Sequence, residues 1–164
     1  MTPLTRCMLL AAALWFAVLP LAGAPAPQTI TVVLDGKPID FYSQIMDERI
    51  PAVLVEGYAM LPVRFFNEAL NIRLDLSLWP WQIVRLGDVR QREYAFKLGE
   101  TAAYTPAPAI GGELSEGFVL PIAPRIIQGR FYVPAQPTLG FFGYDAAWDA
   151  KGKVLMITKQ IATK

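Results

Sequence analysis

The feature that most constrains the fold is a pattern of turn, strand, proline and short helix that occurs twice, 72 residues apart. The two copies align without a gap: Gly57 on Gly129, Pro62 on Pro134, Leu70 on Phe142 and Asn71 on Gly143. Proline is favoured at the first helical position, and glycine or asparagine ends helices in the left-handed conformation. Each copy therefore predicts a hairpin, a short helix and an exit strand, so the chain contains two related units.

Other segments show the two-residue alternation or the β-branched composition of strands. Strands are expected at 29–34, 37–41, 52–55, 58–61, 72–76, 82–86, 92–98, 130–133, 144–148 and 153–158. Asp35-Gly36 predicts a type I′ hairpin turn, and Pro38 restricts its strand to an edge. Pro137 and Gly140 predict a second helix that starts late or is distorted.

These patterns predict an α+β fold that is β-rich, with short helices packed on antiparallel sheets. The two hairpin-helix-strand units would span about 29–86 and 92–159, within one domain covering 29–159. Residues 25–28 would be a linker and 160–164 a tail. The longest loop is expected at 101–117, which is rich in proline, alanine and glycine.

The first 24 residues resemble a secretory signal peptide. Arg6 supplies a positive charge, the run Met8–Leu19 is wholly apolar, and small residues follow up to Ala24. The apolar run is short for a transmembrane helix, which needs about 20 residues. The protein is therefore expected to be secreted or associated with the cell envelope. Retention of the segment as a membrane anchor is the alternative.

Composition excludes several functional classes. The chain has no histidine, and its one cysteine, Cys7, lies in the proposed signal peptide, so Ser-His-Asp and Cys-His catalysis are excluded. Zinc or copper would have only carboxylates to bind, so no metal and no cofactor are expected. A balance of 15 basic and 14 acidic residues offers no electrostatic basis for binding nucleic acid.

Two pairs of carboxylates are the remaining candidates for catalysis, because glycosidases need only two. They are Asp47 with Glu48, and Glu113 with Glu116, which also has glycines beside it and is a weak candidate for Ca²⁺. Both pairs lie in polar, turn-like sequence, where solvated loop charges are the expected interpretation. A carboxylate-only hydrolase is therefore a distant alternative, and the protein is not expected to be an enzyme.

The segment Trp79-Pro80-Trp81 is the most interesting candidate site. Two indoles held by a proline on a turn would form a stacking platform for sugars or for another protein's prolines. Burial in the core is the commoner use of tryptophan and is favoured over that interpretation. Arg64 is included as a candidate ligand contact, although a hydrogen-bonding brace for neighbouring loops is the favoured interpretation. Trp148 is expected to be buried in the core.

The runs VLVEGYAMLPVRFFNEALNIRLDL and RIIQGRFYVPAQPTLGFFGYDAAWD resemble the copper amine oxidase N-terminal-like domain, also called the stalk domain. The resemblance covers about 29–158, although Ala135-Gln136 replaces the family's arginine-bearing pair. It implies an exported bacterial module without the oxidase's catalytic domain. We therefore expect a non-catalytic module that binds a partner protein or a cell-envelope polymer. The alternative is a glycan- or peptidoglycan-binding module that uses Trp79 and Trp81.

We predict that the exported chain begins between Ala24 and Pro27, because the apolar run is short and small residues follow it. Mass spectrometry of the exported protein checks this prediction. Detection of an intact Met1 would contradict it and favour the retained anchor.

Overall fold

The computed structural model describes residues 26–105 and 115–160, so the proposed signal peptide lies outside the described residues. The described part contains fifteen strands, two short α-helices and one 3-10 helix. The strands form one large sheet, one smaller sheet and a two-stranded ribbon. The prediction of a β-rich chain with few short helices and antiparallel sheets is confirmed. No helix within these two ranges is long and apolar enough to cross a membrane.

The larger sheet has eight strands and depends on β1 (Gln28–Leu34), which changes partners along its length. Its first residues pair antiparallel with β5, and its later residues pair with β2 and, in parallel, with β15. The order across the sheet is β12 (Arg125–Ile127), β13 (Arg130–Pro134), β6 (Tyr58–Pro62), β5 (Ala52–Val55), β1, β15 (Val154–Lys159) and β14 (Tyr144–Asp149), with β2 (Lys37–Ile39) beside β1. In this way β1 joins the N-terminal hairpin to the C-terminal one.

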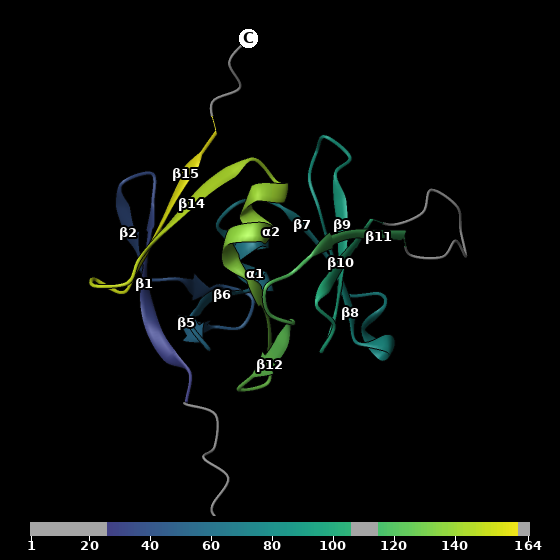
Figure 1. The fold of residues 1–164 in the computed structure, drawn as a ribbon, viewed down its shortest axis with the longest axis horizontal. Coiled ribbons are helices and arrows are strands. Elements are labelled where there is room, and N and C mark those ends of the chain that lie inside the picture. Colours follow the sequence, from purple (N-terminus) through teal and green to yellow (C-terminus); the bar gives the residue numbers. More distant parts are fainter. Residues whose placement is uncertain (1–25, 106–114, 161–164) are drawn as a thin grey trace, which may run out of the picture.

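The smaller sheet is antiparallel and has five strands. Its order is β11 (Ser115–Val119), β10 (Ala102–Thr105), β9 (Glu93–Lys97), β8 (Ile83–Gly87) and β7 (Arg73–Asp75). The separate ribbon consists of β3 (Tyr42–Ser43) and β4 (Glu48–Arg49). Figure 1 shows the smaller sheet on one side of the two helices and the paired strands β1, β14 and β15 on the other.

The prediction that 101–117 forms one long loop is wrong at both ends of this range, because β10 and β11 lie there and form an antiparallel pair. A bulge between Ala103 and Tyr104 shifts the register of this pair. Alanine has a low strand propensity, but Ala102 and Ala103 are both buried. Burial against the neighbouring strand thus overrides local propensity. Residues 106–114 lie outside the described residues.

The predicted hairpin turns form as two-residue turns with positive φ at both central positions. At Asp35-Gly36 the φ angles are 48° and 78°, and β1 and β2 pair on either side. Positive φ at both positions also occurs at 56–57 and 128–129. These values fit the type I′ conformation, whose twist matches that of the strands it joins. β2 pairs only with β1, so Pro38 lies on an edge, as predicted.

The two helices each follow a proline that has an extended conformation. Pro62 precedes α1 (Val63–Glu68) and Pro134 precedes α2 (Ala135–Phe141), each as the N-cap rather than the first helical residue. Of the two outcomes expected for the second helix, a late start or a distortion, the late start does not occur, because α2 begins directly after Pro134. Pro137 is the third helical residue, where the backbone N–H has no intrahelical acceptor to lose.

The strands that lead into the helices pair with each other. β6 and β13 are antiparallel, with Leu61 opposite Val133 and both side chains fully buried. These two residues also occupy the same position in the two copies of the sequence pattern, 72 residues apart. The exit strands differ, since β7 belongs to the smaller sheet and β14 to the larger one.

An aromatic cluster connects α2 to the smaller sheet. The ring of Tyr94 on β9 stacks on Phe141 at a centroid distance of 4.5 Å, and Phe118 on β11 contacts the same ring at 4.5 Å. Phe142 is buried. Trp148 is half-buried and packs on the edge of the main core, so the prediction of full burial is wrong. It lies on β14, the last strand at one end of the large sheet, where fewer neighbours cover it.

We predict that Phe66→Ala lowers the free energy of unfolding by about 3–5 kcal/mol, because Phe66 is fully buried and its loss leaves a cavity. Trp148→Ala should lower it less, because that indole is only partly buried. Urea denaturation of both variants gives the comparison. An equal or greater loss for Trp148→Ala would contradict the packing described above.

Candidate functional site

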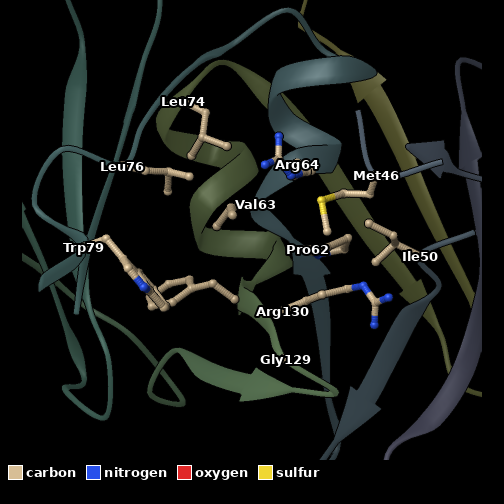
Figure 2. Close-up of a pocket in the computed structure, with 11 residues that line it drawn as sticks. Met46, Ile50, Pro62, Val63, Arg64, Leu74, Leu76, Trp79, Gly129 and Arg130 are labelled. Carbon is tan, nitrogen blue, oxygen red and sulfur yellow. The ribbon is translucent and has the colours of Figure 1, made fainter. Parts of the chain in front are cut away.

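The end of β6 and the start of β13 border an apolar pocket of about 350 Å³ (Figure 2). Its walls come from five parts of the chain: the β3–β4 ribbon, the first turn of α1, β7 with the residues after it, the 3-10 helix, and the β12–β13 turn. The lining residues are Met46, Ile50, Pro62, Val63, Arg64, Leu74, Leu76, Trp79, Gly129, Arg130 and Phe131. The volume falls within the range of small-ligand sites, which begins at about 300 Å³.

The β3–β4 ribbon forms one wall and is held against α1 by Ser43. The Ser43 hydroxyl, fully buried, donates to Oε1 of Glu68 at 2.7 Å, and the Gln44 N–H donates to Oε2 at 2.8 Å. The same hydroxyl accepts from the Met46 N–H at 3.2 Å. These bonds fix the turn between β3 and β4, so that Met46 lies at the rim of the pocket.

Arg130 is neutralised by Glu48, which comes from the same ribbon. Arg130 Nε donates to Glu48 Oε1 at 3.1 Å, and Nη2 forms a second ion-paired hydrogen bond with Oε2. This bidentate bond from Arg130 holds the pKa of the Glu48 carboxyl below its usual range. Glu48 is therefore ionised at neutral pH, and the pair contributes a positive and a negative charge together.

Arg64 has no such partner within the described part of the chain. It projects from the first turn of α1, and Figure 2 shows its guanidinium between Leu74 and Met46. Among the described residues it forms neither an ion pair nor a hydrogen bond, so the bracing role favoured from the sequence does not hold there. Glu68 lies one helical turn later, but both of its carboxylate oxygens already accept bonds from the ribbon.

The two candidate tryptophans lie on a 3-10 helix, η1 (Trp79–Trp81), and neither is buried. Trp79 is 41% exposed and lines the pocket, where its ring meets Phe131 edge-on at a centroid distance of 6.0 Å. Trp81 is 64% exposed and is not part of the lining. Pro80 favours the tight turn, and Gln82 ends it with a φ of 59°. The favoured interpretation, burial of one or both indoles in the core, is therefore wrong.

The structure thus brings Arg64 and Trp79 into one pocket and leaves Trp81 outside it. Sequence reasoning missed Met46, Arg130 and Phe131 as lining residues. Met46 lies in a turn with no distinctive motif, and Arg130 and Phe131 look like ordinary strand residues. The 72-residue repeat was the available signal, because antiparallel pairing of β6 with β13 would place the end of β6 beside the start of β13.

The carboxylate pairs do not form a facing acid and base in the described residues. Glu48 binds Arg130, and Asp47 accepts a hydrogen bond from the Tyr42 hydroxyl. A lowered pKa at Glu48 is opposite to what a general acid needs. Glu113 lies outside the described residues, and only the backbone of Glu116 is described, on β11. No cluster of metal-binding side chains occurs within the described ranges.

We predict that Trp81→Ala changes the free energy of unfolding by less than about 0.5 kcal/mol, as is usual for exposed positions. Trp79→Ala should cost more, because it also removes an edge-on aromatic contact with Phe131, worth about 0.5–1.5 kcal/mol. Thermal and urea unfolding of the two variants measure this difference. A larger loss for Trp81→Ala would show that this indole is structural.

Comparisons with protein-family models, curated proteins and solved structures found no match. The resemblance to the stalk domain therefore stays a prediction from the sequence. The function proposed for this protein rests on its own residues and their geometry.

Proposed function

We propose that this protein is a non-catalytic, extracytoplasmic, stalk-like module that binds a partner protein or cell-envelope polymer through the apolar pocket. The observation that carries the proposal is the pocket itself. It joins the indole of Trp79 to Arg64, which has no ion pair among the described residues, and the other described lining residues are apolar except Arg130. Stalk-like here denotes the resemblance to the copper amine oxidase N-terminal-like domain.

The composition of the rim favours a protein partner. Met46, Leu76 and Trp79 are 45%, 42% and 41% exposed, so the apolar surface continues from the pocket onto the outside of the molecule. Tryptophan, methionine and arginine are enriched where protein interfaces bury their central residues. A pocket with such a rim accepts an anchor side chain, while the rim excludes water around it.

The proposal includes an architecture of two related units. It is supported by the pairing of β6 with β13, whose central residues occupy equivalent positions in the repeat. Each strand follows a two-residue turn with positive φ and leads into a helix through a proline. The pocket lies where the first unit's helix begins beside the second unit's hairpin.

Glycan or peptidoglycan binding is the second candidate, and the exposure of both indoles favours it. Aromatic faces stack on sugar rings, so an exposed Trp79 and Trp81 on one short helix offer two such surfaces. The two candidates differ in the role of Trp81, which lies outside the pocket. Protein binding through the pocket does not need that side chain, whereas a platform of two indoles does.

We predict that p-benzoylphenylalanine in place of Leu76 forms a photo-cross-link to one discrete partner protein in the cells that make this protein. Leu76 lines the pocket and is 42% exposed, so a bound partner must lie next to it. Immunoblotting and mass spectrometry of the product provide the measurement.

The matched control carries the same photo-reactive residue in place of Met156, which is 45% exposed on β15 and does not line the pocket. The same cross-linked product from both positions would contradict the assignment of the pocket as the binding site. Trp81→Ala should leave the Leu76 cross-link unchanged. Loss of retention on purified peptidoglycan in the Trp81→Ala variant, with no protein cross-link, would instead favour the glycan candidate.

A further inference from the structure

We infer that the pocket recognises a polypeptide segment that places a carboxylate directly beside a large apolar side chain. This inference rests on the proposed function and specifies the chemistry of the partner. The apolar side chain enters the cavity, and the carboxylate forms an ion pair with Arg64.

The charge of the pocket lining is the first support. Among the residues that the structure describes, the lining contains two arginines and no acidic residue. Arg130 is already neutralised by Glu48, so Arg64 is the arginine of the lining that has no ion pair among the described residues. A guanidinium whose neighbours are apolar side chains gains most from an anion that the ligand supplies, since it has given up part of its hydration.

The carboxylates of Glu68, one helical turn after Arg64, and of Asp75, between Leu74 and Leu76, bind other groups among the described residues. Both oxygens of Glu68 accept bonds from Ser43 and Gln44, and Asp75 on β7 lies 3.6 Å from Arg85 Nε. Arg64 is therefore the guanidinium of the lining that can form an ion pair with a carboxylate supplied by the ligand. A guanidinium binds a carboxylate in a bidentate manner, which also fixes the ligand's orientation.

The apolar part of the pocket defines the other half of the ligand. Val63, Leu74, Leu76 and Phe131 line the cavity, and the indole of Trp79 closes one side of it. A volume of about 350 Å³ has space for one large aliphatic or aromatic side chain together with part of its backbone. A ligand that places an apolar side chain next to a carboxylate therefore matches both the apolar walls of the pocket and Arg64.

The carboxylate has two sources within a polypeptide: the free C-terminus or an aspartate next to the apolar residue. The probes are therefore four fluorescein-labelled peptides in two matched pairs. The first pair ends in phenylalanine, either as the free acid or as the amide. The second pair is amidated and carries Phe-Asp or Phe-Asn in its interior. Fluorescence anisotropy with the purified chain gives a dissociation constant for each.

We predict that the acid of at least one pair binds about tenfold more tightly than its neutral partner, which corresponds to about 1.4 kcal/mol. Arg64→Gln should abolish this preference and leave the affinity for the neutral peptide unchanged. Arg90→Gln is the matched control, because Arg90 is exposed and lies outside the pocket. Leu76→Asn should weaken the acid and the neutral peptide to the same extent.

Equal affinity of acid and neutral peptides, or a preference that survives in Arg64→Gln, would overturn the inference. Binding of none of the four peptides at millimolar concentration would also overturn it. In either case the Leu76 cross-link tests the proposed function separately, because it needs no assumption about the partner's charge. The pair that shows the preference identifies which source of the carboxylate the pocket reads.

Discussion

The pairing of β6 with β13 is the interaction on which the rest of the structure depends. Leu61 and Val133 face each other in the main core with no exposed surface, and each strand continues through a proline into a helix. The paired residues 60–62 and 132–134 are all buried, so the backbone hydrogen bonds between them cannot be exchanged for bonds to water without exposing apolar surface. This pair therefore holds the two hairpins and the two helices in one body.

The position of the pocket also follows from the register between β6 and β13. With Pro62 opposite Tyr132, the end of β6 and the start of β13 lie at one end of the sheet, which places Arg64 and Arg130 on the same cavity. The equivalent position in the second helix is Gln136, whose amide donates to the backbone carbonyl of Ala146. Because the two helices start with different residues, a near-symmetric pairing of strands yields an asymmetric site.

The charge of the pocket depends on which carboxylates already bind other groups in the folded chain. Glu48 binds one arginine, and Glu68 binds the ribbon that carries Glu48, so the ribbon both shapes the cavity and neutralises half of its positive charge. A guanidinium in an apolar wall, with no ion pair in the described part of the chain, is a selective element, since a cation or an uncharged polar group gains little from it.

The sequence by itself determined the local elements: the Gly turns, the prolines before both helices and the left-handed Asn71 and Gly143 are set by short-range sterics. It failed at β10, whose alanines form a strand only because they are buried, and at Trp148, whose burial depends on its place at the sheet edge. The sequence identified Arg64 and Trp79 as candidates but not the residues that lie beside them in the pocket. Only the tertiary structure decided which residues share the pocket, because Met46, Arg130 and Phe131 reach it through pairings between residues far apart in the chain. No local pattern encodes the ion pair between Arg130 and Glu48, which leaves Arg64 free among the described residues.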